Sequence, residues 1–464
     1  MHPISINDFF NEVTPYAVCV RGAQRVNSTD LISDVARFVD RIKLLPHQNW
    51  ILASSNTYTF LCGFLALLAC GREILLPPNN QSGTINETIN GADALLTDLE
   101  FETAYPVVRP DFDAKSYQLD KDISIEPSEL YLQLCTSGSS GKPKQIRKSL
   151  ATLLEEVNWL EKLWGEQLNE VTYISTVSHQ HIYGLLFRVL WPLLTRRLFV
   201  TENIEYPEQI DAYIKRYGRV VLISSPAYLK RMVDIFVEGQ FAGAVQQIFS
   251  SGGPLSRDTS LEYTHKLGVT PTEVLGSTET GGIASRQQQV DEPTPWQRMP
   301  VVQIKRDETT HALQVKSPFC YTDGWYQMGD AVELLDDVHF HLSGRIDRIV
   351  KLEEKRISLD AMEQQLSHVT WIEEARIVVL EGYRVILGAV CILSTEGAHA
   401  LRQLGKREFT DQLKSGLLSH FDRVTLPRKW RYVNEFPYNT QGKTTQSDLR
   451  QLFEENSNDG TTGN

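Results

Sequence analysis

The sequence lacks the features of a secreted, disulfide-rich or membrane-spanning protein. Its six cysteines are scattered and never form a CxxC pair, which argues against a disulfide scaffold and against a zinc site. The N-terminal segment MHPISINDFF has no basic region followed by an apolar stretch, so no signal peptide is evident. The longest apolar run, residues 60–70, is about half as long as a bilayer-spanning helix must be. We therefore expect a cytoplasmic protein with no membrane insertion, and a buried helix at residues 57–70.

The chain also has fewer positively charged than negatively charged residues. The chain has 46 Lys and Arg residues against 58 Asp and Glu residues, which gives a formal net charge of -12. A general nucleic-acid binder gains its affinity by neutralising phosphates with Lys and Arg. The charge balance therefore argues against a nucleic-acid partner and against docking on an anionic membrane.

The chain of 464 residues is too long for one ordinary hydrophobic core, so two or more domains are expected. Residues 49–56 are typical of a strand and turn, and residues 72–80 of a strand that two prolines end. With the helix between them, this order predicts a βαβ unit and a parallel sheet. Leucines at helical spacing predict an amphipathic helix at 149–168.

From about residue 300 the pattern changes to short strands separated by turns, and a small α+β section begins near Gly344. We therefore predict an α/β protein with an N-terminal domain at 1–343 and a C-terminal domain at 344–455. The polar tail at 456–464 has the composition of a disordered segment.

A loop of glycine, hydroxyl and lysine residues, TSGSSGKPK at 136–144, directly follows a strand-like run. Such a loop commonly presents backbone N–H groups and ammonium charge to a phosphate. It is not a Walker A loop, because Thr136 stands at the position of the first glycine and Pro143 at the position of the magnesium-binding hydroxyl. By itself the stretch could also be a flexible surface linker.

Further motifs favour the phosphate loop. VLGSTETGG at 274–282 places a threonine and a glutamate in a second glycine-rich turn after a strand. GWYQMGD at 324–330 ends in a carboxylate and is followed by SGRIDRIVK at 343–351. PYNTQGKTT at 437–445 presents a lysine in a glycine turn just before a helix.

In order and approximate spacing, these motifs resemble those of the adenylate-forming superfamily of acyl-CoA synthetases, non-ribosomal peptide adenylation domains and luciferases. The resemblance spans most of the chain. It implies a large N-terminal domain of stacked mixed β-sheets with helices and a small mobile α+β C-terminal domain. It also implies that a carboxylic acid and ATP give an acyl-adenylate and pyrophosphate, after which a thiol displaces AMP. Both reactants of the first step are anions, so the site must neutralise them.

The resemblance assigns a role to each matched residue. The loop residues expected to hold the β- and γ-phosphates are Thr136, Ser137, Gly138, Ser139, Ser140, Gly141 and Lys142. Gly276 and Ser277 belong to the nucleotide motif. Thr278 is expected to contact the α-phosphate, and Glu279 to coordinate Mg²⁺, a hard cation that prefers oxygen ligands. Asp330 is expected to accept hydrogen bonds from the ribose hydroxyls.

The remaining assignments concern the C-terminal part of the chain. Arg345 is expected to contact the nucleotide, and Asp347 matches the hinge about which the small domain rotates. Lys443 is expected to reach the attacking carboxylate oxygen and the α-phosphate during adenylation. Arg356 matches a position that approaches the phosphate in the second step.

Each residue also has a structural alternative. Glu279 alone would more often be a solvated charge, and Asp330 alone could be a turn cap; their joint occurrence in matched motifs favours the functional interpretation. His179 has no counterpart in the resemblance and is interpreted as structural, whereas for His181 a pocket role and a packing role have equal weight. The expected walls of the acid pocket are His181, Tyr183, Gly184, Ser225, Ser251, Gly252, Gly253 and Ile283.

The chain departs from the family pattern in ways that affect its substrates. Leu275 stands where an aromatic residue usually stacks on adenine, and Met328 replaces a threonine beside the ribose. The glycine-rich stretch usual between residues 283 and 300 is replaced by polar residues. Glu354 stands where the family usually has a glycine beside the pantetheine path, so we expect free CoA to be a poor acceptor and the phosphopantetheine arm of an acyl carrier protein to be a plausible one.

The leading hypothesis is an ATP- and Mg²⁺-dependent carboxylic acid–thiol ligase that uses CoA or a carrier-protein phosphopantetheine. Because neither a basic nor an acidic residue stands out among the pocket residues, aromatic or fatty acids are favoured over dicarboxylic or amino acids. One alternative is an adenylating enzyme that passes its acyl-AMP to a hydroxyl, an amine or oxygen. Another is a nucleotide-binding protein without turnover.

Overall fold

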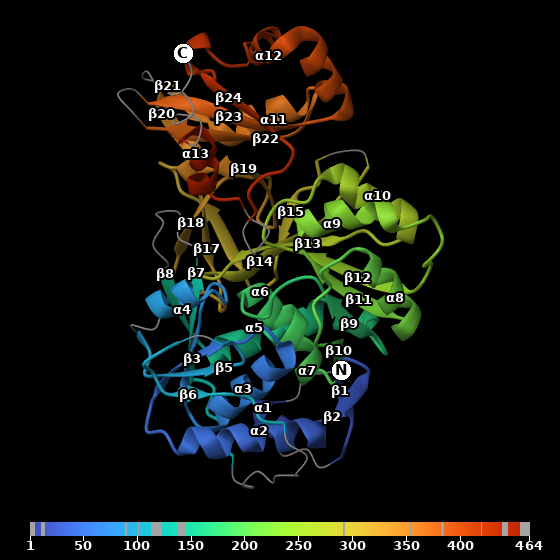
Figure 1. The fold of residues 1–464 in the computed structure, drawn as a ribbon, viewed down its shortest axis with the longest axis vertical. Helices are drawn as coiled ribbons and strands as arrows, with labels where there is room; N and C mark the ends of the chain where they lie inside the picture. The colour runs from blue at the N-terminus through green and yellow to red at the C-terminus, as the bar shows by residue number, and fades with distance from the viewer. Residues whose placement is uncertain are drawn as a thin grey trace, which may run out of the picture. The chain divides into compact units, whose positions relative to one another are not determined.

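The computed structural model describes residues 5–10, 14–88, 91–100, 102–112, 123–136, 144–290, 293–352, 355–381, 385–418, 420–438 and 444–454 (Figure 1). They form two compact units. Unit 1 comprises Met1–Gln303 with Val315–Tyr326, and unit 2 comprises Ile304–Gln314 with Gln327–Asn464. The domain boundary predicted between residues 343 and 344 lies within unit 2. It stays a prediction, because it concerns the rotation of one domain, and a division into compact units does not test rotation. The tail at 456–464 lies outside the described residues.

One sheet of unit 1 has the strand order β6-β5-β3-β4-β7-β8. Its strands are β3 (Asn49–Ala53), β4 (Glu73–Leu76), β5 (Ala94–Thr97), β6 (Val107–Val108), β7 (Tyr131–Thr136) and β8 (Lys144–Ser149). Helices α1 (Ile6–Phe10), α2 (Ser28–Lys43), α3 (Thr57–Ala69) and α4 (Ser82–Thr88) belong to the same part of the chain. Strands β3 and β4 are parallel neighbours joined by α3, which confirms the predicted βαβ unit. Only β8 runs antiparallel to its neighbour.

Helix α3 is the buried helix predicted from the apolar run. Every residue from Thr57 to Leu68 is buried, and the helix packs against β3, β4 and β5. Its start is fixed by the Asn56 side chain, which accepts hydrogen bonds from the backbone N–H groups of Tyr58 and Thr59. Among the described residues, none of the helices combines the length and the apolar character that a bilayer crossing requires.

The other strands of unit 1 follow the order β15-β14-β13-β12-β11-β9-β10-β1-β2. They are β1 (Ala17–Arg21), β2 (Gln24–Asn27), β9 (Thr172–Ser175), β10 (Leu198–Val200), β11 (Val220–Ser224), β12 (Val245–Ser250), β13 (Thr272–Ser277), β14 (Gly281–Gln287) and β15 (Trp296–Arg298). Neighbours from β1 to β13 are parallel, and β2, β14 and β15 are antiparallel. This mixture of parallel and antiparallel strands confirms the predicted α/β class with mixed sheets.

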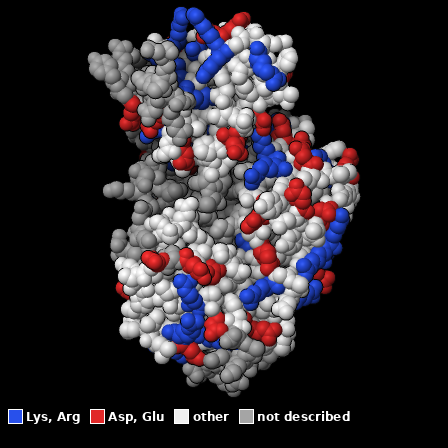
Figure 2. All heavy atoms as spheres, in the orientation of Figure 1, with Lys and Arg blue, Asp and Glu red and all other residues white. Residues whose placement is uncertain are grey.

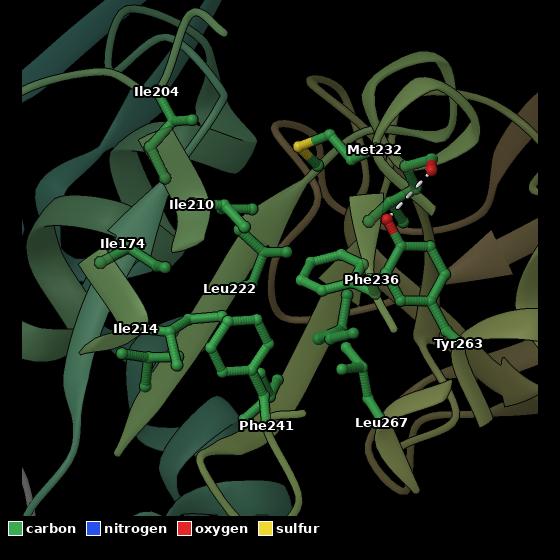
Figure 3. Packing of buried hydrophobic residues seen from close by; sticks show 14 of the residues in the cluster. Ile174, Ile204, Ile210, Ile214, Leu222, Met232, Phe236, Phe241, Tyr263 and Leu267 are labelled. Atoms are coloured by element: carbon green, nitrogen blue, oxygen red, sulfur yellow. Dashed lines mark hydrogen bonds between the residues drawn. The ribbon is translucent and has the colours of Figure 1, made fainter. Parts of the chain in front are cut away.

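The helices of this part of unit 1 are α5 (Leu150–Trp164), η2 (Gly165–Gln167), α6 (Ile182–Gly184), the π-helix η3 (Leu185–Leu190), α7 (Trp191–Leu194), α8 (Glu208–Tyr217), α9 (Pro226–Met232), η4 (Val233–Ile235) and α10 (Arg257–Leu267). Buried residues of α8, α9 and α10 pack with those of β9 and β11 in one apolar cluster (Figure 3). Within it, the ring centroids of Phe236 and Tyr263 lie 5.7 Å apart, and the Tyr263 hydroxyl donates to the Leu229 carbonyl at 3.0 Å. The cluster supports the strands whose ends carry the predicted pocket residues.

Unit 2 contains most of the strands β16 (Gln303–Arg306), β17 (Ala312–Lys316) and β18 (Tyr326–Leu334) and all of β19 (His339–Arg345), in that order across the sheet. Next along the chain come η5 (Ile346–Arg348) and a hairpin of β20 (Ile349–Leu352) and β21 (Lys355–Ser358). A three-stranded sheet of β22 (Ile372–Leu380), β23 (Ile386–Leu393) and β24 (Lys429–Val433) is accompanied by α11 (Leu359–Ser367), α12 (Thr395–Leu417), η6 (Arg423–Thr425) and α13 (Gln446–Glu454). The C-terminal section therefore has the mixture of helices and strands that the sequence predicted.

Candidate functional site

Several predicted site residues of unit 1 lie at one edge of its parallel strands. Strands β9, β11, β12 and β13 are adjacent and parallel, so their carboxyl ends meet at a single edge, where α/β sheets bind ligands. The predicted pocket residues that directly follow β11 and β12 are Ser225, Ser251, Gly252 and Gly253. Gly276 and Ser277 close β13. The structure thus brings together residues that are far apart in the sequence, from Ser225 to Ser277.

The turn between β13 and β14 carries Thr278 and Glu279. The Ser277 N–H donates to Thr280 Oγ1 at 3.1 Å, and the Thr280 N–H donates to Ser277 Oγ at 3.2 Å. Gly276 lies so close to the returning strand that a Cβ atom there would be 2.4 Å from the Gly281 carbonyl oxygen. Glycine at 276 is therefore required by the close approach of the two strands, independently of any ligand.

Glu279 faces Lys144, the last residue of the predicted phosphate loop. The Lys144 Nζ atom lies 3.7 Å from Glu279 Oε1, and it lies 5.4 Å from the centroid of the Tyr321 ring. The backbone N–H of Tyr321 donates to the Glu279 carbonyl at 2.9 Å. Lys144 belongs to the loop motif, but the sequence does not distinguish it as a site residue. Only the fold shows that β8 begins beside the β13–β14 turn.

The surroundings of Glu279 fit a magnesium–nucleotide complex. Its side chain is 18% exposed, and carboxylate oxygens are ligands that Mg²⁺ prefers. Among the described residues, no three His, Cys, Asp or Glu side chains come together as a metal cage. Mg²⁺ is commonly held by one or two carboxylates together with substrate phosphates, so a site with fewer than three protein ligands is compatible with a magnesium–nucleotide complex.

Two of the residues predicted to line the acid pocket, Tyr183 and Ile283, belong to a hydrophobic framework. The ring centroids of Tyr183 and Phe187 lie 4.9 Å apart, and those of Phe187 and Phe249 lie 5.2 Å apart. Phe249 belongs to β12, so the aromatic group connects the segment after β9 with the strand that leads to Ser251. Ile283, on β14, is completely buried. These contacts place Tyr183 and Ile283 on a hydrophobic framework.

The segment around His181 is tightly folded. His181 is half-buried and precedes α6 as its N-cap residue. At Gly184 a Cβ atom would lie 1.9 Å from the Ser178 carbonyl oxygen, so only glycine allows this close packing. Glycine at 184 therefore has a structural cause, and the pocket role predicted for it stays a prediction.

His179, interpreted from the sequence as structural, is buried. Its Nε2 atom lies 3.0 Å from the Ser54 carbonyl oxygen and so carries the hydrogen, which leaves Nδ1 to accept from the Thr57 hydroxyl at 2.9 Å. Burial and the nearby Arg188 charge lower the pKa of His179 from 6.5 to about 3. The imidazole is therefore neutral and holds helix α3 against the segment after β9.

This depressed pKa makes a testable prediction. Between pH 6.5 and pH 3 the unfolded chain binds a proton at His179 that the folded chain excludes, so acidification costs stability at about 1.4 kcal/mol per pH unit. A His179→Gln variant loses this contribution. In denaturant unfolding at pH 7, 6 and 5, the stability difference between wild type and variant should shrink as the pH falls. A difference that stays constant would contradict the assigned protonation state.

In unit 2, the ribose motif and the hinge motif are cross-strand neighbours. Asp330 on β18 pairs with Arg345 on β19, and the Arg345 guanidinium lies against Gly329, where a Cβ atom would be 2.6 Å from its Nη2. The Arg345 N–H donates to Asp360 Oδ2 at 2.8 Å, and Arg348 pairs with Asp360 Oδ1 at 2.7 Å. The two residues predicted to contact the nucleotide in this unit are therefore brought together by strand pairing.

Other predicted site residues cannot be placed in this way. The loop residues Ser137, Gly138, Ser139, Ser140, Gly141 and Lys142, and the predicted catalytic Lys443, lie outside the described residues. Thr136, Asp347 and Arg356 belong to β7, η5 and β21, but the structure describes their backbone alone. The roles of all these residues stay predictions.

Charged side chains of both signs are interspersed on the face of the molecule drawn in Figure 2. On this face acidic and basic side chains lie close to one another over much of the surface that is not grey. The net charge of -12 does not favour an anionic nucleotide, so attraction of one would depend on local basic groups such as Lys144.

A family model described as AMP-binding enzyme matches residues 32–310. The D-alanine–D-alanyl carrier protein ligase of Staphylococcus aureus is 23% identical over 371 residues, which are 72% of this chain and 73% of the relative. Among solved structures, ATP-bound MatB from Rhodopseudomonas palustris aligns with a TM-score of 0.81 at 17% identity, over 98% of this chain and 99% of that chain.

A second solved structure is o-succinylbenzoate CoA synthetase (MenE) from Bacillus subtilis in complex with its acyl-adenylate. It aligns with a TM-score of 0.79 at 15% identity, over 97% of this chain and 98% of that chain. At these identities the two structures establish the shared fold alone. They confirm the fold class expected from the motif resemblance.

Proposed function

The chain belongs to the AMP-binding enzyme family, and we propose that it is an ATP-dependent ligase that adenylates an aryl or fatty acid and transfers the acyl group to a phosphopantetheine thiol. The single observation that carries the proposal is the position of Glu279. Its carboxylate lies beside Lys144 at the end of the predicted phosphate loop, on the turn that follows a parallel strand. A metal ligand and an ammonium group at one turn suit a metal-bound triphosphate.

In the proposed first step, a carboxylate oxygen of the acid attacks the α-phosphorus of ATP, and the bond to the bridging oxygen breaks to release pyrophosphate. In the second step, the thiol sulfur attacks the acyl carbon, its proton is lost, and AMP leaves. Thr278 and Lys144 would bind phosphate oxygens, and Asp330 would bind the ribose. Mg²⁺ held by Glu279 would neutralise phosphate charge. Lys443 would stabilise the charge that develops as the two anions meet.

The acid class is proposed from the pocket walls. The aromatic contacts of Tyr183 with Phe187, and of Phe187 with Phe249, make the framework apolar. Neither Asp nor Glu occurs among the eight predicted pocket residues, so an α-amino group would find no counter-charge among them. This favours an aryl or fatty acid, although D-alanine is the acid named for the relative from Staphylococcus aureus.

The carrier-protein acceptor is supported by the name of that relative, a carrier protein ligase, and by Glu354. We expect Glu354→Gly to raise kcat/KM for free CoA about tenfold, equivalent to about 1.4 kcal/mol, because it removes bulk and negative charge from the proposed thiol path. The measurement compares acyl-thioester formation with CoA and with holo carrier protein for both forms. Efficient use of CoA by the wild type would contradict the proposed acceptor preference.

The test of the proposed function is ATP–pyrophosphate exchange with a panel of aryl, fatty and amino acids. Exchange that depends on an aryl or fatty acid is expected, since it reports the first step without knowledge of the acceptor. Exchange only with amino acids would overturn the proposed acid class. Exchange without thioester formation from CoA or carrier protein would favour a non-thiol acceptor. Failure to exchange with every acid tested would favour a nucleotide-binding protein without turnover.

A further inference from the structure

Two buried charged residues lie behind the turn that carries Glu279. Lys148, at the end of β8, is 1% exposed, and Glu156, on α5, is 2% exposed. They have opposite charges and attract each other, although burial disfavours the charged form of each. Lysine and glutamate side chains are rarely this deeply buried unless they are paired and hydrogen-bonded.

The hydrogen bonds of these two residues go to the backbone on either side of Glu279. Glu156 Oε1 accepts from the Gly282 N–H at 2.7 Å, just after the turn. Lys148 Nζ donates to the Phe319 carbonyl at 2.6 Å, in the segment whose Tyr321 N–H donates to the Glu279 carbonyl at 2.9 Å. The turn is therefore held at the strand that follows it and at the segment that binds its carbonyl.

The fit beneath the turn is close. Gly281 adopts a positive φ of 66°, and a Cβ atom there would lie 2.6 Å from Glu156 Oε2. Glu156 Oε2 has no hydrogen-bond partner among the described residues, so the carboxylate is oriented by its one bond to Gly282 and by the charge of Lys148. A side chain of another shape or polarity would change the path of the chain from Glu279 into β14.

From this geometry we infer that Lys148 and Glu156 are positioning residues that fix the turn bearing Glu279 for the metal-bound nucleotide. The inference rests on the proposed function, since it assigns the turn to MgATP. It adds that the metal ligand is held in place by buried charges contributed by the β8–α5 segment, which directly follows the phosphate loop. The segment that follows the loop in the sequence thus also supports the turn that carries Glu279.

The test measures ATP binding to the full chain by calorimetry, once with Mg²⁺ and once with EDTA. The wild type is expected to bind ATP more tightly with Mg²⁺. Glu156→Leu removes the acceptor for the Gly282 N–H. It should reduce the ratio of the ATP affinities with and without Mg²⁺ at least tenfold, with little change in the affinity measured in EDTA. Glu156→Gln keeps an oxygen acceptor and should retain most of the gain.

The matched control is Glu161→Leu. Glu161 lies on the same helix, is 5% exposed, and binds Arg197 and Trp191 away from the turn. Its replacement should lower the thermal unfolding midpoint, as expected for any broken buried pair, and leave the Mg²⁺-dependent gain at the wild-type value. A purely structural role of Glu156 would give the same result as this control.

Retention of the full gain by Glu156→Leu overturns the inference. If that variant does not fold, Lys148→Met is measured instead; it removes the donor to Phe319 and should lose the Mg²⁺-dependent gain. A Lys148→Met variant that keeps the gain overturns the inference, and so does the failure of both variants to fold. Acid-dependent pyrophosphate exchange by the wild type tests the proposed function separately. If the wild type shows exchange and Glu156→Leu keeps the Mg²⁺-dependent gain in ATP affinity, the positioning role alone is refuted. If the wild type shows neither exchange nor a Mg²⁺-dependent gain, the positioning role and the proposed function are both refuted.

Discussion

Replacing Lys443 with alanine should lower ATP–pyrophosphate exchange by about 10²–10³-fold, the range seen when one preorganised stabilising group is removed from a transition state. The acid carboxylate and the α-phosphate repel each other, and the ammonium group would offset that repulsion only while they react. Since the acyl-adenylate no longer presents this pair of anions, transfer of its acyl group to a thiol should not need the lysine.

The measurement therefore separates the two half-reactions. Exchange is followed with the acid that the wild type accepts, and transfer is followed with chemically prepared acyl-adenylate and the accepted thiol. Lys429→Ala, a change of an exposed lysine on β24, serves as the control and should leave both rates near the wild-type values. Equal loss of exchange and transfer in the Lys443 variant would contradict the proposed division of labour.

Replacing Gly276 with alanine should lower exchange by about 10²-fold, the loss that a displacement of about 1 Å can cause in a catalytic site. The added methyl group would lie 2.4 Å from the Gly281 carbonyl oxygen, well inside the contact distance of about 3.5 Å. Strands β13 and β14 would have to separate, and Thr278 and Glu279 would move with the turn. Overpacking of this kind also costs about 1–3 kcal/mol of stability.

Thermal unfolding and exchange are measured together on the Gly276 variant. The matched glycine is Gly83 on α4, where an added Cβ would have no neighbour within 4 Å. Gly83→Ala should leave exchange unchanged and should not destabilise the fold. A Gly276→Ala protein with wild-type exchange would show that the turn does not position the reacting groups.

The elements of the fold were predictable where a local pattern is strong. The apolar run predicted the buried helix α3, and the leucine spacing predicted the helix that begins at Leu150. The strand–helix–strand order predicted the parallel pair β3 and β4. Each of these depends on residues close together in the chain, whose side chains set the local periodicity.

The sequence could predict which residues form the candidate site, but not which buried residues hold them in place. The motifs indicated Glu279 and the phosphate loop, but no local pattern indicated that Lys144 would lie beside Glu279. Nor did any pattern distinguish Lys148 and Glu156 from solvated charges, since a lysine after a strand and a glutamate on an amphipathic helix are usually exposed. Only their burial beneath the turn shows what they bind.

The sequence by itself therefore determined the fold class, the helices and strands with clear periodicity, and the family to which the motifs belong. The tertiary structure decided which charged groups meet at the β13–β14 turn, why Gly276 and Gly184 have no room for a side chain, and why His179 is neutral. The physical reason is range. Periodicity and turn chemistry act between neighbours along the chain, whereas desolvation, charge pairing and close packing depend on residues that the fold brings together from distant positions.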